Sequence, residues 1–390
     1  MSAPLTFPVS KSLSPELLHN NIDSRVVKIR PAATPLDQIS RFAGARKCSS
    51  MQVEFYSARM KDPSSEVTEA VAEQKRIQQG NVVNIKVKTS SIFSPSETIV
   101  IPAATAGGKA VVGYINEIEG TTLKLIPVGT YPYDLPAIAV GAKVVRMGRA
   151  AGELDVQTSI HTTLPNKDFN LCQIFKTQIE ESFYHRLADK EVGWTFNDQE
   201  EMAIMDMRLG IERSYLFGIR QRLRRPDGEE VLLAGGIWNQ AKGEFGYSAM
   251  TGETLNAMMR KAFTNAGGSK RKVLLAGSGL IEKLSNLEHQ RVVLSSETTT
   301  HWGIDFQTIV SKFGTLYVVL SEVFDMCGMP DAGMVIDPEY LTKYVHVPLS
   351  AERISFRKQG VRNTEAVVLT EASCLVLRYP DAHMRIVPEA

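Results

Sequence analysis

Cysteine, tryptophan and histidine are scarce in this 390-residue chain, which contains four, three and seven of them. The four cysteines lie far apart in the sequence and form no CxxC pair: Cys48, Cys172, Cys327 and Cys374. Structural zinc sites and secreted disulfide frameworks are built on closely spaced cysteines, so the sequence argues against both classes. We expect reduced thiols in a protein made inside a cell.

Long apolar runs and a strong net charge are missing as well. No stretch of about 20 residues is apolar enough to suggest a membrane span. The N-terminal sequence MSAPLTFPVS lacks the basic-then-apolar order of a signal peptide. The net charge is +1, so no overall field draws the chain to nucleic acid or membrane. With 43% hydrophobic and 22% charged residues, the composition is that of a globular protein with two or three domains.

Catalytic motifs are not evident. The histidines show no HExxH spacing, and the glycines form no GxGxxG or GxxxxGK[ST] phosphate loop. Gly277-Ser278-Gly279 resembles part of a nucleophile elbow, but Ala276 occupies the first glycine position, and a plain strand-to-helix turn is the better interpretation. We therefore expect no catalytic, cofactor-binding or metal-binding residues.

One enzymatic alternative stays open at this point. Three aspartates would form a carboxylate metal site if they met in space near Ser278: Asp305, Asp325 and Asp337. Each of them also stands near turn residues, where aspartate is common. A soluble metal-dependent enzyme is therefore kept as a minor hypothesis.

A long helix is the main feature that the sequence does predict, over residues 197–225. Thr195 or Asn197, each followed three residues later by an acid, can cap its start, and Pro226-Asp227-Gly228 can stop it. Between these signals an apolar stripe at spacings of three and four is interrupted once, by Glu212: Met202, Met205, Leu209, Leu216, Ile219 and Leu223. The basic run RQRLRRPDG is interpreted as a dipole-complementing helix end, with phosphate contact as the alternative.

The segments before and after this helix differ in composition and in the secondary structure that they predict. Residues 1–35 are proline-rich and indicate either an arm that lies along another surface or a loosely ordered terminus. Residues 64–80 predict a short helix with Val67, Ala70, Val71 and Ile77 on one face. Residues 81–149 contain several short β-rich runs, typical of a small barrel or sandwich. The middle of the chain predicts α+β structure, and EAVVLTEASCLVLRY near the end predicts two long strands of one sheet.

Four passages in this order resemble the major capsid proteins of tailed bacteriophages with the Hong Kong 97-type fold, in a branch with an inserted β module. They are Thr34–Asp62 (TPLDQISRFAGARKCSSMQVEFYSARMKD), Asn170–Leu187 leading to Glu212 at the family's acidic position, Gly235-Gly236, and the ending with Glu371 and Ala382-His383. The family's tryptophan near position 55 is replaced by Phe55-Tyr56. The order and spacing of these passages carry the resemblance.

The resemblance implies an α+β fold with a long spine helix on a β-sheet, an axial domain, an extended loop and an N-terminal arm. The implied boundaries are an arm at 1–48, a loop region at 49–190 containing a small β-barrel-like domain at 81–149, a peripheral domain at 191–235 and 344–390, and an axial domain at 236–343. Six residues are candidates for interface or structural roles: Phe55, Tyr56, Phe175, Trp194, Leu216 and Trp238.

The implied function is assembly without catalysis. Copies of the chain would form the hexamers and pentamers of an icosahedral shell around the phage dsDNA, assembled in the host cytoplasm and found in the virion. Expected partners are neighbouring subunits, the portal, and decoration or scaffolding proteins, with weak DNA contact, no membrane and no cofactor. The alternatives are another virion component, such as a cementing or scaffold-like protein, or the metal-dependent enzyme.

Overall fold

The computed structural model describes residues 34–58, 61–103, 109–153, 165–187, 195–264, 268–288, 294–301 and 304–389. The chain divides into two compact units: a larger one formed by Met1–Tyr56 and Lys167–Ala390, and a smaller one formed by Ser57–Asn166. Most of the predicted N-terminal arm, residues 1–33, lies outside the described residues.

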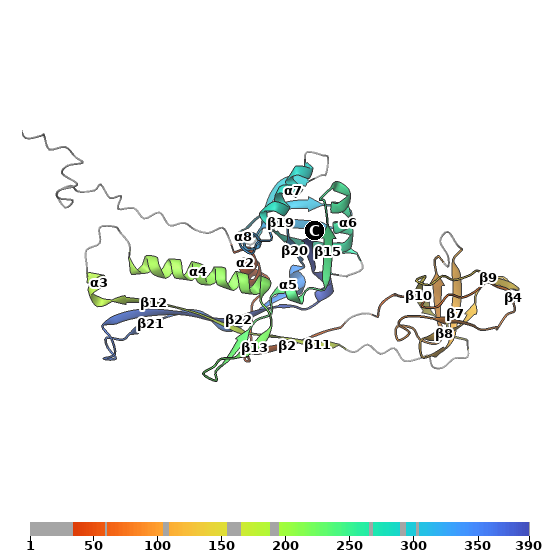
Figure 1. The fold of residues 1–390 in the computed structure, drawn as a ribbon, viewed down its shortest axis with the longest axis horizontal. Helices are drawn as coiled ribbons and strands as arrows, with labels where there is room; N and C mark the ends of the chain where they lie inside the picture. Colours follow the sequence, from red (N-terminus) through yellow and green to blue (C-terminus); the bar gives the residue numbers. More distant parts are fainter. Residues whose placement is uncertain are drawn as a thin grey trace, which may run out of the picture. The chain divides into compact units, whose positions relative to one another are not determined.

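A four-stranded sheet in the order β1-β21-β22-β12 is the frame of the larger unit. Its strands are β1 (Arg46–Lys47), β12 (Gln173–Ser182), β21 (Leu341–Ser355) and β22 (Thr364–Leu377). β22 pairs antiparallel with both long neighbours, whereas β1 adds in parallel at the β21 edge. The long helix α4 (Phe196–Phe217) lies along this sheet, and the short helices α2 (Pro35–Phe42) and α3 (Phe183–Leu187) contact α4 and β12, respectively (Figure 1).

The EAVVLTEASCLVL segment is one strand, β22, instead of the two predicted strands. Its polar residues Glu371 and Ser373 are both buried within the strand. Other parts of the chain bind these two side chains, so the strand continues past them without a turn.

A seven-stranded sheet in the order β15-β23-β20-β16-β19-β18-β17 is the second sheet of the larger unit. The strands are β15 (Gly243–Tyr247), β16 (Arg271–Ala276), β17 (Leu294–His301), β18 (Ile304–Val310), β19 (Thr315–Leu320), β20 (Gly333–Ile336) and β23 (Met384–Pro388). The helices of this region are α5 (Ile237–Gln240), α6 (Gly252–Phe263), α7 (Ser278–Glu288), α8 (Glu322–Met326), η2 (Pro338–Tyr340) and η3 (Pro380–Ala382).

The last strand, β23, lies in a different sheet from β21 and β22. It pairs with β15 and β20 in the seven-stranded sheet, whereas the sequence predicts that residues 344–390 belong together. Met384 and Ile386 are buried in the core of that sheet. Burial of these two side chains draws the C-terminal segment away from β22, which it follows in sequence.

The long helix ends eight residues before the predicted end. After Phe217 the chain turns at Gly218 and forms a hairpin of β13 (Gln221–Arg224) and β14 (Glu230–Leu233), with Pro226-Asp227-Gly228 in its turn. A side chain at Gly218 would come within 2.5 Å of the carbonyl oxygens of Ser214 and Ala234, so only glycine allows this reversal. The end of the predicted stripe is therefore wrong: Ile219 is 68% exposed and Leu223 40% exposed.

Other residues of the same segment determine where α4 begins and which face of the helix is buried. The Thr195–Asp198 capping box predicted from the sequence is confirmed. The buried face consists of Met207, Ile211, Glu212, Tyr215 and Leu216, so Leu216 is the one member of the predicted stripe that is fully buried. The other members of the predicted stripe within the helix, Met202, Met205 and Leu209, are only partly buried.

Two further strands connect the larger unit to the point where the chain enters and leaves the smaller one. β2 (Gln52–Ser57) pairs with β11 (Asn166–Leu171) in a separate two-stranded sheet. Residues of β2 alternate between buried and exposed, so Phe55 and Tyr56 point to opposite sides. Phe55 lies in a small core with Val53, Cys172, Ala234, Cys374 and Val376.

The smaller unit is built from strands alone among its described residues. A six-stranded sheet has the order β3-β10-β6-β7-β8-β5, and β4 pairs with β9. The strands are β3 (Ser64–Glu66), β4 (Gln74–Ile77), β5 (Val83–Lys86), β6 (Glu97–Ile101), β7 (Val111–Glu119), β8 (Thr122–Pro127), β9 (Tyr133–Leu135) and β10 (Lys143–Arg149). A bridge between Val67 and Val87 joins the ends of the two edge strands, β3 and β5.

The helix predicted over residues 64–80 is wrong, because β3 and β4 occupy this range. Val67, Val71 and Ile77 are all at odd positions and face the core of the smaller unit, as a period of two requires. Their backbone bonds to distant segments decide the outcome: Val67 N–H donates to Ala142 O at 2.9 Å and Val71 N–H to Ile138 O at 2.9 Å.

Candidate assembly surfaces and the buried anchor cluster

Glu212 connects the long helix to the segment that precedes β1. Its carboxylate oxygens accept hydrogen bonds from the backbone N–H groups of Leu36, at 2.8 Å, and Asp37, at 2.6 Å. These are among the free donors of the first turn of α2, whose first residue, Pro35, has no N–H to offer. A side chain 175 residues away in the sequence therefore caps α2.

Buried charges extend from this cap to the four-stranded sheet. Lys343 Nζ lies 3.2 Å from Asp37 Oδ1 and 2.8 Å from Glu371 Oε1, and all three side chains are at least 96% buried. Arg41 pairs with the same Asp37 from one turn further along α2. We call Asp37, Glu212, Lys343 and Glu371 the anchor cluster. It links α2, α4, β21 and β22 through contacts between residues far apart in sequence.

Tyr215 and Ser373 complete the hydrogen bonding of the cluster. The Tyr215 hydroxyl donates to Ser373 Oγ at 2.7 Å, and Ser373 Oγ donates to Glu371 Oε1 at 2.7 Å. The Lys343 ammonium lies 5.3 Å from the centre of the Tyr215 ring. Burial raises the pKa of Tyr215 well above its usual value, so its hydroxyl stays protonated and keeps donating.

Glu212 makes the cluster sensitive to pH. Burial raises its pKa to about 8, although the two backbone donors of α2 act in the opposite direction. Because the folded state holds a proton that the unfolded state releases near pH 4.5, the stability contributed by Glu212 is present at low pH. It is lost as the pH rises toward 8.

We expect the free energy of unfolding of the unassembled subunit to fall by about 1.5 kcal/mol between pH 6.5 and pH 8.0 through Glu212. His383, whose pKa is lowered to about 3 by burial, acts with the opposite sign and mainly below pH 6.5, and in this window it offsets only about 0.4 kcal/mol of the fall. Urea denaturation at both pH values measures the difference. The Glu212→Gln variant should lose this slope, and an unchanged slope in that variant would contradict the assignment.

Two of the passages that carry the family resemblance, the one that begins at Asn170 and Gly235-Gly236, meet next to the anchor cluster. The Asn170 side chain donates to Gly235 O at 3.0 Å and to Leu375 O at 2.7 Å, and it accepts from Gly235 N–H at 2.8 Å. A side chain at Gly236 would come within 2.6 Å of Leu216 O. The double glycine is therefore required where β14 passes the end of α4, and Asn170 fixes it to β22.

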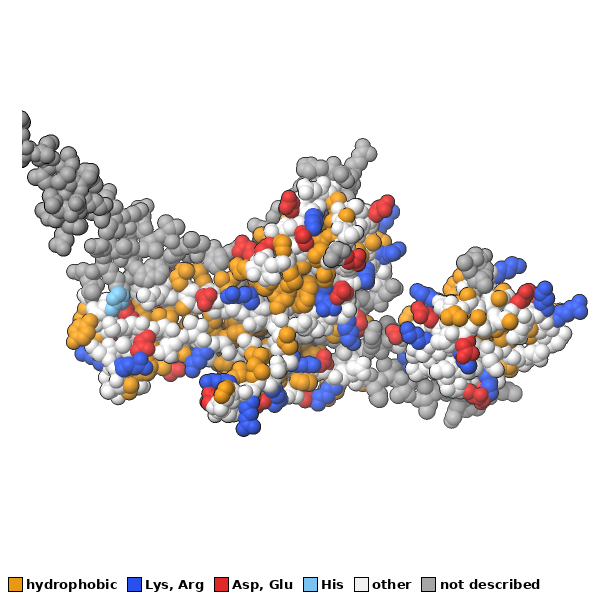
Figure 2. Space-filling view, in the orientation of Figure 1, with side chains coloured by type: hydrophobic (Ala, Val, Ile, Leu, Met, Phe, Trp, Pro, Cys, Tyr) orange, Lys and Arg blue, Asp and Glu red, His pale blue; other side chains and the backbone are white. Residues whose placement is uncertain are grey.

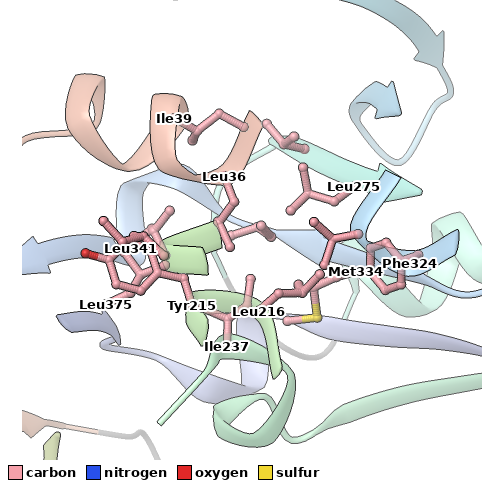
Figure 3. Packing of buried hydrophobic residues seen from close by; sticks show 14 of the residues in the cluster. Leu36, Ile39, Tyr215, Leu216, Ile237, Leu275, Phe324, Met334, Leu341 and Leu375 are labelled. Atoms are coloured by element: carbon pink, nitrogen blue, oxygen red, sulfur yellow. The ribbon is translucent and has the colours of Figure 1, made fainter. Parts of the chain in front are cut away.

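The six residues that the sequence analysis named for interface or structural roles differ in their burial. Phe55, Phe175 and Leu216 are buried, and Phe175 packs edge-on against Tyr215 at 6.3 Å. Trp238 is partly buried and contacts the rings of Phe217 and Phe324. Figure 3 shows the core around Leu216, with Leu36 of α2 directed toward Tyr215 and Leu216. Tyr56 is 62% exposed, and Trp194 lies outside the described residues.

The larger unit exposes large apolar side chains on several elements (Figure 2). They are found on β2, β12, α3, β18, β19, α8, the hairpin region after α4 and the loop between β21 and β22: Tyr56, Ile174, Tyr184, Leu187, Ile219, Leu223, Val310, Leu320, Met326 and Val361. In addition, the second half of β21 is largely exposed, although its first three residues are buried. These elements lack the cover that a sheet of a soluble monomer normally has.

Three arginines of the basic run after the long helix form ion pairs with acidic side chains. Arg222 pairs with Glu230 across the hairpin, Arg225 with Asp227 and Glu229, and Arg220 with Asp168 of β11. The predicted helix end is wrong, because these arginines follow α4 and lie on or beside a hairpin. Arg224 donates to Gly228 O across the turn, and phosphate contact stays a prediction.

The residues of the enzymatic alternative serve as helix caps. Asp325 accepts hydrogen bonds from the backbone N–H and hydroxyl of Ser278 at the start of α7. Asp337 accepts from Ser269 and Glu339 and caps η2. The side-chain surroundings of Asp305 are not among those described. Within the described residues, no group of three metal-ligating side chains is placed to hold an ion, and no helix is long and apolar enough to cross a membrane.

Sequence reasoning missed two charged members of the anchor cluster, Lys343 and Asp37, and a cluster of thiols. Glu212 and Glu371 were named through the family resemblance, and Glu212 also interrupts the apolar stripe, but the burial of the two carboxylates was not predicted. Cys48, Cys172 and Cys374 lie far apart in sequence but meet in the structure. No local pattern marks such long-range contacts.

Comparison with solved structures defines the class of protein. A chain of Mycobacterium phage Adephagia is similar over 100% of this chain and 99% of that chain, with a TM-score of 0.51 and 8% identity. A chain of the capsid of a native GTA particle is similar over 98% of this chain and 99% of that chain, with a TM-score of 0.50 and 8% identity. The fold is thus that of the Hong Kong 97-type phage capsid proteins, an α+β fold.

The family follows from the sequence itself. The family model of the SU10 major capsid protein matches residues 6–389, and the chain belongs to this family. It is a structural protein that forms the icosahedral shell of a bacteriophage and is located in the capsid of the virion. Identical subunits assemble into the capsid lattice. Comparison with curated proteins finds no match.

Proposed function

We propose that the chain acts in the shell without catalysis, as the repeated subunit of hexamers and pentamers that close around packaged dsDNA. The portal and decoration or scaffolding proteins are the proposed further partners, and DNA contact is weak because the chain has almost no net charge. The observation that carries this proposal is the set of exposed apolar side chains on the larger unit of a capsid-family chain.

Many modest contacts per subunit suit this role. A contact of micromolar strength, about −8 kcal/mol, lets a misplaced subunit leave, whereas several such contacts acting together hold a finished shell. The exposed apolar residues lie on β2, β12, α3, β18, β19, α8 and two hairpins, so they are distributed over separate elements. Distributed elements can contact several neighbours at once.

We further propose a division of the larger unit into two working parts. The four-stranded sheet with α4 corresponds to the peripheral domain, and the seven-stranded sheet with α6, α7 and α8 corresponds to the axial domain, which gathers at the five-fold and six-fold positions. β23 belongs to the axial part in this proposal. The smaller unit, 57–166, is the inserted β module.

Substitution of Tyr56 tests the proposed interface role, and substitution of the adjacent Phe55 is the control. Tyr56→Asp should leave the subunit folded, because the side chain is mostly exposed, but should reduce particle formation at least tenfold by placing a charge in an apolar contact. Tyr56→Phe keeps the ring and should assemble. Phe55→Asp, on the buried side of the same strand, should yield unfolded protein.

Expression of the chain, sedimentation on a gradient and negative-stain microscopy measure particle formation, and circular dichroism measures folding. Shells, tubes or isolated five-fold and six-fold rings are the expected products of the unsubstituted chain. Normal particle yield from Tyr56→Asp would exclude Tyr56 from the subunit contacts. A monomer that forms no rings or shells with its scaffold and portal present would contradict the proposed oligomers.

A further inference from the structure

Three cysteines from separate parts of the chain form a row inside the larger unit. The sulfur of Cys172 lies 3.7 Å from that of Cys48 and 3.6 Å from that of Cys374. Cys172 and Cys374 are fully buried, whereas Cys48 is partly exposed. All three thiols are free, and the fourth cysteine, Cys327, is exposed on another element.

The backbone holds the row in place. Cys48 N–H donates to Val345 O of β21 at 3.0 Å, and Cys172 N–H donates to Met51 O at 2.7 Å. Cys172 directly precedes β12, whose first residue, Gln173, pairs with Ser373 of β22. The sulfur of Cys172 therefore contacts both other sulfurs, and its distance of 3.7 Å from the sulfur of Cys48 exceeds the S–S bond length of a disulfide by about 1.7 Å.

Cys48 and Cys172 also mark the two ends of the insertion. Cys48 precedes β2, along which the chain leaves for the smaller unit, and Cys172 follows β11, along which it returns. The two residues are 124 positions apart, and the whole of 57–166 lies between them. A bond between them would close the insertion at its base.

We propose that Cys48 and Cys172 are an oxidation site, and that an external low-molecular-weight disulfide converts them to an intramolecular disulfide in the released particle. The reducing interior of a cell keeps such thiols reduced during assembly, and an oxidising medium lets the bond form afterwards. The bond locks the ends of the insertion in the finished shell.

The exchange balances in two steps. The Cys48 thiolate attacks the external disulfide, whose S–S bond breaks and releases one small thiolate. The Cys172 thiolate then attacks the Cys48 sulfur and expels the second small thiolate, and both released thiolates take up protons. Two protein thiols are oxidised by two electrons, and one external disulfide is reduced to two thiols.

The cluster favours this pair over the bond between Cys172 and Cys374. Cys48 is the member that a soluble disulfide can reach, because Cys374 is fully buried in the central strand β22. Contacts with Cys374 and Cys48 lower the pKa of the Cys172 thiol, which suits the attacking role in the second step. Burial raises the pKa of Cys48 to about 12, so the first step is slow at neutral pH and faster in alkaline buffer.

The test uses assembled particles of the full chain, incubated with reduced or with oxidised glutathione. The particles are then denatured in the presence of the alkylating reagent so that every free thiol reacts, and the chain is examined on a non-reducing gel and by peptide mapping. After oxidation, two of the four cysteines should resist alkylation, a Cys48–Cys172 peptide pair should appear, and the looped chain should migrate faster. Added reductant should reverse all three changes.

Variants separate the possible pairs. Cys48→Ser should abolish the faster band, whereas Cys327→Ser, the matched control, and Cys374→Ser should retain it. Four alkylated cysteines after prolonged oxidation at pH 8.5, or a Cys172–Cys374 peptide pair in its place, would overturn the proposal. Mapping of the unsubstituted chain decides the question even if a variant at the buried Cys172 does not fold.

Discussion

Replacement of Lys343 by methionine is expected to lower the free energy of unfolding of the subunit by about 3–5 kcal/mol. The methionine fills a similar volume, so the main change is the loss of the ammonium group from the anchor cluster. Asp37 and Glu371, which Lys343 contacts at 3.2 and 2.8 Å, then remain buried without this cation. Chemical denaturation of the unassembled subunit measures the loss.

Two controls show whether the loss comes from the buried charges. Lys358→Met, at an exposed position between β21 and β22, should change stability by no more than about 0.5 kcal/mol. Adding Glu371→Gln to Lys343→Met should restore part of the stability, because one unpaired carboxylate is removed. A Lys343→Met subunit as stable as the unsubstituted one would show that the cluster does not hold α2 in place.

Leu216→Asp should prevent folding, and assembly with it. Leu216 is fully buried in the core where α4, α2 and the strands of both sheets meet (Figure 3). An aspartate there loses the packing of the leucine and buries an unpaired charge, which together cost more than about 5 kcal/mol, a large share of the stability of a typical domain. Insoluble protein, or a soluble chain without cooperative unfolding, is the expected result.

Ile219→Asp is the matched comparison, three residues further along the chain. Its side chain is 68% exposed, so the subunit should fold with a stability change of no more than about 0.5 kcal/mol. Assembly of this variant then reports on the surface alone. Normal particles from Leu216→Asp would refute the burial of this face of α4.

The long helix shows how far local signals reach. Its start was predictable, because the Thr195–Asp198 capping box is a short-range arrangement. Its end was not, because Gly218 stops the helix through close contacts with Ser214 and with Ala234 and Gly236 of a later segment. Pro226-Asp227-Gly228 was predicted to stop the helix, but in the structure it forms the turn of the β13–β14 hairpin.

The β module shows the same division. Its short strands over residues 81–149 were visible as apolar runs between turn residues. The strands at 64–77 were missed, because their apolar spacing fits a helix as well as a strand. Backbone pairing with residues 138 and 142 decided between the two, and such pairing has no local signature.

By itself the sequence determined the capped start of α4, the short strands of residues 81–149 and, through the order of four weak passages, the capsid family. The tertiary structure decided which charges are buried and which thiols meet. Lys343 and Asp37 are 306 residues apart, and Cys48 and Cys172 are 124 apart. Local periodicity carries no information about contacts at such separations, because these contacts form only when distant segments of the chain pack together in the folded protein.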